Sequence, residues 1–432
     1  MLSFAIREKK EGKNNMNKKE VLELKKRFKK EECTFTKLAG CYVNAGREKV
    51  TKIHETFLNL DDDELFKYLE IAKKALSGTV GNNILTLDFP KEEEELGGRA
   101  QFLLALEKDG LNNEDLLDRF YDLVIDHYKY AGNFLILLFK DAYDVPTKTS
   151  DNIKLDESEE VFDYILCAIC PVNLSKAGLG YLENEHKIGP RIRDWVVGAP
   201  DMGFIYPSFE DRGTDIHKIS YYVKDPKDSH PEFIENVLGA GAKRTATEKT
   251  TAFKAIVKHA VAQDEEVCTE TLMAIQGAIK EHLDEEADLP EYEKTSSALT
   301  ANLMDNVLSQ SGIPEETAKK IKADYLEEFD DELCLIEDLV DKRAIENYER
   351  DKEHADLNKQ VVELKQELKD TKAILGEHPM SGDEIKTYDV ILRVKPEKAG
   401  QIKSDRIDGK KVLIIPMEEN ENINLNGVNT KL

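Results

Sequence analysis

The chain of 432 residues has little cysteine, a single tryptophan and no long hydrophobic run. Its six cysteines are too few and too irregularly spaced for the disulfide framework of a small secreted domain, so we expect reduced thiols and a cytoplasmic protein. The strongest apolar run, FLILLF at 134–139, has the length of a strand and is far too short to span a membrane. The first residues lack the apolar region of a signal peptide, which favours the same interpretation.

Basic residues are also in deficit, because 61 Lys and Arg face 86 Asp and Glu, for a net charge of −25. Residues 1–60 differ, since they hold 15 basic and 8 acidic residues. An acidic surface repels phosphate backbones, so nucleic acid is an unlikely partner except through the basic helix expected near residues 17–30. That helix is either an ordinary solvated helix or a contact for RNA or the ribosome. Its basic residues are Lys18, Lys19, Lys25, Lys26, Arg27, Lys29 and Lys30.

The length of the chain exceeds what one hydrophobic core usually serves, so we expect several domains. Changes in composition and periodicity divide the sequence as follows: a non-native or disordered extension at 1–15, an α+β core at 16–230, a helical region at 231–345, a charged long helix at 346–380 and a small β module at 381–432. We expect translation to begin at Met16, which mass spectrometry of the native protein would check.

Turn signals and alternating apolar residues define the fold class. Residues 40–53 read as a β-hairpin, and residues 161–224 contain at least five short strands. The connections between these strands are too short for repeated helical crossovers, which favours antiparallel pairing. Asp408-Gly409 and Asn426-Gly427 predict two-residue hairpin turns near the end of the chain. We therefore predict an α+β protein with a mainly antiparallel central sheet, amino-terminal helices, a following helical region and a small carboxy-terminal β module.

Cys167 and Cys170 have the spacing of a redox or metal-binding pair. They lie inside the apolar run YILCAICPV, which predicts a strand. Residues three apart on a strand point to opposite faces, so the two thiols should diverge into the core. A second pair of zinc ligands is also missing from the sequence, and we expect no metal site here.

The segment RIRDW at 191–195 holds the best candidate ligand-binding residues. On a strand, Arg191 and Arg193 share a face and could grip a phosphate or a carboxylate. Trp195 would lie on the same face and offer a surface for stacking. The alternative is that both arginines pair with some of the many acidic residues of the chain itself.

The segment DRGTDIH at 211–217 supplies further candidates. Arg212 could act as a second clamp for an anion, and Asp215 and His217 would share a face on an extended chain, with Asp211 close by in sequence. Such an Asp–His pair could act as acid and base or bind a metal. A metal would need further ligands from afar, with His186 as one candidate, so a capping Asp and a hydrogen-bonded His are the alternative.

These residues lead to three hypotheses for function. The first is a cytoplasmic ligand- or partner-binding regulatory protein whose pocket near residues 191–217 takes an anionic small molecule or an acidic protein surface. The second is a hydrolase or phosphate-handling enzyme that uses Asp215 and His217, with Asp194 or Asp211 in the same cleft. The third is a ribosome- or RNA-associated factor that acts through the basic helix. No segment matches a cofactor motif, so the cofactor is left unassigned.

Several segments resemble a bacterial family that is defined only as a domain of unknown function. They are MNKKEVLELKKRF, GCYVNAGREKV, KKALSGTVGNN, YILCAICPVNLSKAGLGY, IGPRIRDWVVGAPDMGFIYPSFEDRGTDIH and IDGKKVLIIP. The resemblance runs from Met16 to near the end of the chain and is most specific between Tyr164 and His217. It implies a bacterial cytosolic protein that starts at Met16. It carries over no activity, substrate or site residue.

Overall fold

The structure, a computed structural model, describes residues 16–148, 154–261, 264–287, 298–329, 332–376, 402–408, 410–414, 423–425 and 428–430. Contacts divide the chain into two compact units, Met1–Lys352 and Glu353–Leu432. The expected extension at 1–15 and the segment 381–401 of the expected β module lie outside the described residues. Among the helices that are described, none has the length and apolar character needed to cross a membrane.

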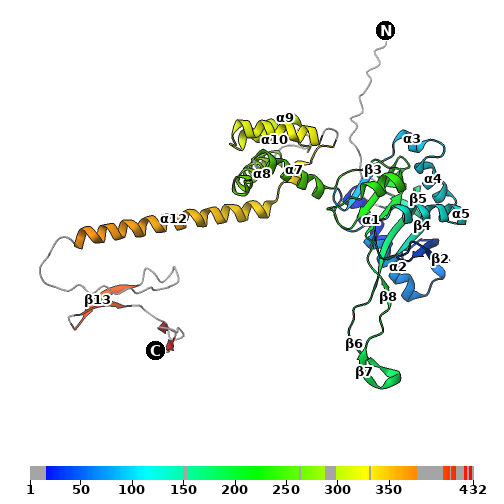
Figure 1. Ribbon diagram of the computed structural model, residues 1–432, viewed down its shortest axis with the longest axis horizontal. Coiled ribbons are helices and arrows are strands. Elements are labelled where there is room, and N and C mark those ends of the chain that lie inside the picture. The colour runs from blue at the N-terminus through cyan, green and yellow to red at the C-terminus, as the bar shows by residue number, and fades with distance from the viewer. Residues whose placement is uncertain are drawn as a thin grey trace, which may run out of the picture. The chain divides into compact units, whose positions relative to one another are not determined.

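An eight-stranded antiparallel sheet forms the centre of the first unit (Figure 1). Its strands are β1 (Lys37–Val43), β2 (Lys49–Thr56), β3 (Ile84–Asp88), β4 (Asn133–Lys148), β5 (Lys154–Leu174), β8 (Trp195–Val197), β9 (Met202–Tyr206) and β12 (Lys218–Val223). The order is β2-β1-β4-β5-β9-β12-β3, and β8 pairs with the end of β5. The predicted α+β fold with a mainly antiparallel sheet is confirmed. The hairpin expected at 40–53 is β1–β2.

Helices cover both faces of this sheet. One face packs against α1 (Lys18–Arg27) and α2 (Asp62–Lys74). The other face packs against α4 (Arg99–Lys108), α5 (Glu114–His127), α6 (Pro231–Phe233) and the π-helical turn η3 (Ile234–Leu238). The short element η1 (Phe57–Asn59) lies between β2 and α2, and α3 (Lys91–Glu94) lies between β3 and α4.

Burial on both faces explains why the central strands are apolar at every position. Along β4, Ile136 and Leu138 enter one core, whereas Leu135 and Leu137 enter the other. The neighbouring strand β5 separates the two thiols in the same way. Cys167 lies in the first core and Cys170 in the second, as predicted. Burial raises the pKa of the Cys170 thiol to about 12, so it stays protonated and inert near neutral pH.

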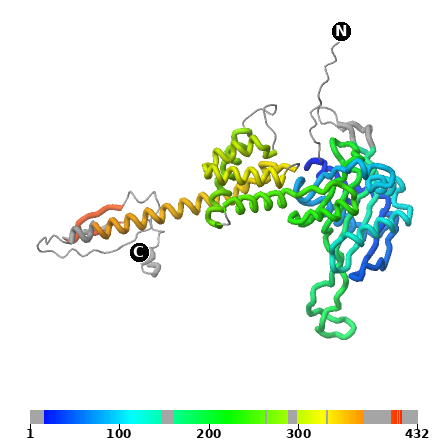
Figure 2. Tube along the Cα trace, turned by 45° about the horizontal axis from the view of Figure 1, so that its top comes forward, coloured from blue at the N-terminus to red at the C-terminus, as the bar shows by residue number. Residues whose placement is uncertain are grey.

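A helical bundle follows the sheet in sequence, as the periodicity predicts, and the green trace in Figure 2 runs from the sheet into its first helix. Its helices are α7 (Ala246–Ala260), α8 (Glu265–Ala287), α9 (Ala301–Gln310), α10 (Glu315–Glu328) and α11 (Ile336–Leu339). They enclose a third core that includes Phe253, Ile275, Met304 and Tyr325. Thr245 and Glu248 form a capping box that fixes the start of α7.

The charged segment after the bundle forms one long helix, α12 (Lys342–Gly376). Two small hairpins follow: β13 (Lys403–Ile407) with β14 (Lys410–Ile414), and β15 (Ile423–Leu425) with β16 (Val428–Thr430). Asp408 has a φ of +51° in the first turn, which suits a two-residue hairpin loop. Both hairpins occur where Asp-Gly and Asn-Gly predict them.

Candidate functional site

The segment after β5 leaves the sheet and returns to it as β8. Between them lie β6 (Leu179–Leu182), the turn η2 (Glu183–Glu185) and β7 (Lys187–Pro190). Figure 1 shows β6 and β7 at the end of a narrow projection from the sheet. We call residues 172–197 the arm.

The arm is a two-stranded ribbon whose strands are interrupted at residues 175–178 and 191–194. Val172 pairs with Val197 at its base, and Leu182 pairs with Lys187 at its tip. In between, the Ser175 amide donates to the Asp194 carbonyl and the Arg191 amide donates to the Gly178 carbonyl. These four pairs share one register, so neither strand contains an inserted residue (a β-bulge). The register therefore assigns alternate residues to opposite faces of the ribbon.

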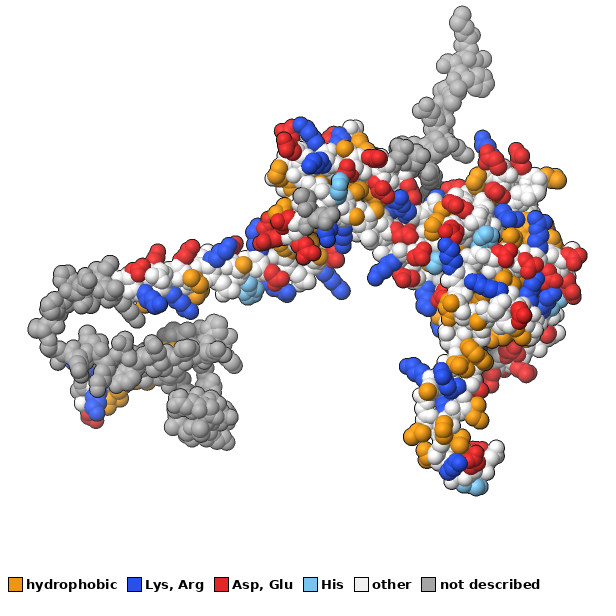
Figure 3. All heavy atoms as spheres, in the orientation of Figure 1, with side chains coloured by type: hydrophobic (Ala, Val, Ile, Leu, Met, Phe, Trp, Pro, Cys, Tyr) orange, Lys and Arg blue, Asp and Glu red, His pale blue; other side chains and the backbone are white. Residues whose placement is uncertain are grey.

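One face of the arm is apolar and exposed. The register places on it Leu179, Tyr181, Ile188, Pro190, Ile192 and Val196, with Asn173, Ser175 and Asp194 near the base of the arm. Leu179 is 77%, Ile188 66% and Ile192 76% exposed. Orange hydrophobic side chains follow the arm in the lower part of Figure 3. A contiguous apolar patch of this kind on a folded protein indicates an interaction surface.

The opposite face of the arm is basic. The register places on it the cations Lys176, Lys187, Arg191 and Arg193, together with the apolar side chains of Leu174, Leu182, Trp195 and Val197. The position of a Cβ on Gly180 would lie 3.7 Å from Cβ of Arg191, which confirms that these two residues share a face. The register thus assigns Arg191, Arg193 and Trp195 to one face, and their part in ligand binding stays a prediction.

Most cations of the basic face have no acidic partner among the described residues. Arg193 Nε donates to the Ser175 carbonyl at 2.7 Å, which holds its guanidinium along the ribbon. Among the described residues, neither Lys176 nor the two arginines form an ion pair, and only Lys187 does so, with Glu185 at 2.5 Å. The alternative that Arg191 and Arg193 pair with the acidic residues of the chain is therefore wrong for the described part.

Arg212 has a different environment. Arg212 lies with Asp211 in the turn between β10 (Ser208–Glu210) and β11 (Gly213–Asp215). Both residues have positive φ, +47° for Asp211 and +60° for Arg212. Arg212 Nη2 lies 3.3 Å from Glu23 Oε1 on α1, and its amide donates to Glu20 Oε1. These contacts attach the hairpin to α1, so Arg212 serves the fold.

Asp215 and His217 are also engaged locally. Asp215 Oδ1 accepts the amide hydrogen of His217 at 2.9 Å and Asp215 Oδ2 lies 3.5 Å from Lys218 Nζ. The His217 Nδ1 lies 2.9 Å from Glu94 Oε1. This is the capping Asp and hydrogen-bonded His of the second interpretation. His186 is at the tip of the arm, and no group of three or more His, Cys, Asp or Glu in the described residues could hold a metal ion.

The expectation that Arg191, Arg193, Trp195 and Arg212 line one pocket needs correction. Trp195 pairs with Leu174 at the carboxyl end of β5. The β10–β11 hairpin instead packs near the middle of this strand, where the ring of Phe209 lies 4.7 Å from that of Phe162. These points on β5 are 12 residues apart, or about 40 Å at the usual rise per residue. Arg212 is therefore too far from the other three residues to line one pocket with them.

The basic helix α1 is partly used by the fold. Val21 and Leu24 are buried against the sheet, Arg27 lies 3.6 Å from the buried Asp141, and Lys30 pairs with Asp62 at 2.6 Å. Its remaining lysines form a solvated face. A contact with RNA or the ribosome through this face stays a prediction.

Comparison with known proteins adds the family and no activity. The model of a family described as "Domain of unknown function (DUF4317)" matches residues 16–428. A search of curated proteins finds no match.

Proposed function

The chain belongs to the DUF4317 family, which matches nearly its whole length, and we propose that it is a cytoplasmic binding protein that recognises an acidic protein surface through the arm. The single observation that carries the proposal is the register of the arm, which places most of its exposed apolar side chains on one face and its unpaired cations on the other. A partner that contacts both faces would offer an apolar strip bordered by carboxylates. Arg191 and Arg193 would each bind a carboxylate, and Trp195 would pack beside them.

A protein partner fits the arm better than nucleic acid does. Phosphate groups would bind the basic face, but they would leave Leu179, Ile188 and Ile192 in water. Fully burying one such side chain is worth about 1.5–3 kcal/mol, so a protein that covers the apolar face gains more than a phosphate backbone can supply there. The unpaired cations of the basic face would also attract carboxylates on such a protein.

The cytoplasmic location is part of the proposal. All six cysteines lie in described residues and are free thiols, which suits a reducing compartment. The bacterial origin implied by the sequence resemblance is consistent with this and remains part of the same proposal.

Photo-crosslinking in living cells tests the proposal. A photoreactive amino acid replaces Ile188 on the apolar face. The control replaces Leu96, which is even more exposed and lies far from the arm in sequence. We expect a discrete protein adduct from position 188 and none of that mass from position 96. The adduct should disappear when Arg191 and Arg193 are both changed to Glu. The captured protein, once purified, should bind the full chain with an affinity that falls as salt rises.

Three results would overturn the proposal. The first is the same set of adducts from both positions, and the second is an adduct that contains RNA or DNA. The third is an adduct made only of two copies of this chain, which would make the arm a dimerisation element. An adduct that survives the two Arg→Glu changes would separately remove the acidic surface from the description of the partner.

A further inference from the structure

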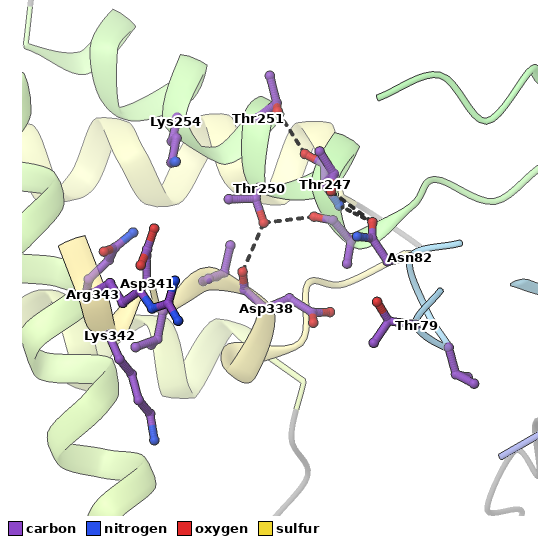
Figure 4. A pocket seen from close by; sticks show the side chains of 15 residues that line it. Thr79, Asn82, Thr247, Thr250, Thr251, Lys254, Asp338, Asp341, Lys342 and Arg343 are labelled. Atoms are coloured by element: carbon purple, nitrogen blue, oxygen red, sulfur yellow. Dashed lines mark hydrogen bonds between the residues drawn. The ribbon is translucent and has the colours of Figure 1, made fainter. Parts of the chain in front are cut away.

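A polar cleft of about 650 Å³ lies between the sheet and the helical bundle, far from the arm in sequence (Figure 4). Its walls come from the loop before β3, from α7 and α8, and from the segment that joins α11 to α12. The lining includes Thr79, Asn82, Thr247, Thr250, Thr251, Lys254, Gln276 and the run Asp338–Arg343. Figure 4 shows the threonines along α7 on one side and Asp341, Lys342 and Arg343 on the other.

The start of α7 is fixed by the sheet. The Ala246 amide donates to the Gly81 carbonyl at 3.0 Å. Thr247 donates both its amide and its hydroxyl hydrogen to Asn82 Oδ1, at 3.1 and 2.9 Å. The first amides of α7 are thus used by the protein itself, so the end of this helix is not where a ligand would bind. These contacts make the cleft a preformed space.

The opposite wall is fixed to the same helix. The Thr250 hydroxyl lies within hydrogen-bonding distance of the carbonyls of Ala246 and Asp338, at 2.8 and 3.0 Å. Asp341 Oδ1 accepts the amide hydrogen of Ala344 at 3.0 Å and so caps the start of α12. The segment that carries the basic residues is therefore held in place by α7 and by its own cap.

Three cations line the cleft. They are Lys254, Lys342 and Arg343, and no carboxylate among the described residues lies within ion-pairing distance of any of them. Asp338 and Asp341 also line the cleft, yet neither pairs with these cations. In a chain with a net charge of −25, three unpaired cations around one cleft favour an anionic ligand.

Gln276 gives a second, independent indication of a ligand. It comes from the middle of α8, its residue is only 2% exposed, and it lines the cleft. Its Oε1 atom has no hydrogen-bond partner within the described part of the chain. A buried oxygen without a donor is costly to the fold, and a ligand with a hydroxyl group would satisfy it.

We propose that this cleft binds a phosphorylated small molecule that carries hydroxyl groups, such as a sugar phosphate. The phosphate contacts Lys254, Lys342 and Arg343, and a hydroxyl group donates to Gln276 Oε1. The site is separate from the arm, so the two proposals stand or fall independently.

Isothermal titration calorimetry of the full chain with three probes tests the site. Ribose 5-phosphate contains both groups, inorganic phosphate has only the anion, and ribose has only the hydroxyls. We expect ribose 5-phosphate to bind more tightly than either of the others. Arg343→Gln should weaken both phosphate-containing probes about tenfold, because it removes a charge-assisted hydrogen bond. The matched control is Arg350→Gln on the same helix, whose guanidinium bonds to Asn347 within α12.

Gln276→Met separates the hydroxyl contact from the phosphate contact. This substitution keeps the volume and removes the unpaired oxygen, so the thermal stability of the ligand-free protein should stay equal or rise. It should weaken ribose 5-phosphate and leave inorganic phosphate unchanged. The proposal is overturned if none of the probes binds at millimolar concentration, or if Arg343→Gln and Arg350→Gln have the same effect. Equal weakening of both phosphate-containing probes by Gln276→Met would remove the hydroxyl group from the ligand.

Discussion

Removal of the Asp141 carboxylate should strongly destabilise the central sheet. Asp141 lies on β4, is 1% exposed and accepts hydrogen bonds from the Thr34 hydroxyl at 2.5 Å and the Tyr164 hydroxyl at 2.6 Å. The Arg27 guanidinium lies 3.6 Å away and also donates to Thr34. Asp141→Ala leaves a largely buried cation and the buried Tyr164 hydroxyl without this acceptor. Breaking a buried charge pair in this way costs about 3–5 kcal/mol.

Hydrogen exchange measured by mass spectrometry can localise the effect. The peptide that covers 134–139 reports on β4, and a loss of about 3 kcal/mol should speed its slowest amides roughly 100-fold. Asp144→Ala is the matched control, because Asp144 lies on the same strand and is exposed, so its removal should change stability by less than about 0.5 kcal/mol. Asp141→Asn should fall in between, since it keeps an acceptor oxygen. An acceleration below about fivefold for Asp141→Ala would refute the role of this network.

Three further predictions concern stability. Arg212→Gln should lower the free energy of unfolding by about 1 kcal/mol, because Arg212 pairs with Glu23. Arg191→Gln should leave it unchanged, since Arg191 has no acidic partner among the described residues. Equal urea midpoints for the two variants would contradict this. Burial raises the pKa of the Cys41 and Cys334 thiols from 9.0 to about 11, so their contribution to stability is complete below pH 9 and is lost as the pH rises through about 11. Urea titrations between pH 8 and 11 should show that decline, and Cys41→Ala should make it shallower; a flat profile in the parent protein would argue against it. Thr245→Ala removes the cap of α7 and should cost about 1 kcal/mol in thermal unfolding, with the exposed Thr269→Ala as a control that should change little.

Local patterns in the sequence were sufficient for the main features of the fold. The unbroken apolar run at 134–139 predicts a strand buried on both faces, and the two-residue turns predict the terminal hairpins. The same alternation places Cys167 and Cys170 in different cores. These features depend on residues that are close in sequence, where strand geometry alone decides the outcome.

The candidate site depends on distant residues and was harder to predict. Sequence placed Arg191, Arg193 and Trp195 on one face, but it could not tell that the strand carrying them leaves the sheet. Arg212 lies only 17 residues beyond Trp195, yet its partner Glu23 is 189 residues away in sequence, and no local pattern reveals such a pair. A signal for the arm was present in LGYLENEHKIGPRI, where two short apolar alternations flank a polar turn.

The cleft lay entirely beyond sequence reasoning. Its walls join segments near residues 79, 247, 276 and 340, which tertiary packing alone brings together. Gln276 in particular occupies a helix whose neighbouring residues are ordinary for a bundle. Only its burial and its unpaired oxygen distinguish it.

The single register of the arm makes the difference between its two faces vulnerable to a change of chain length. One residue added after Ser175 would shift that strand by a single step and turn every later side chain of the strand over. Leu179 and Tyr181 would then lie on the same side as Arg191 and Arg193. The separation of nonpolar from positively charged side chains would be lost although every amino acid was kept.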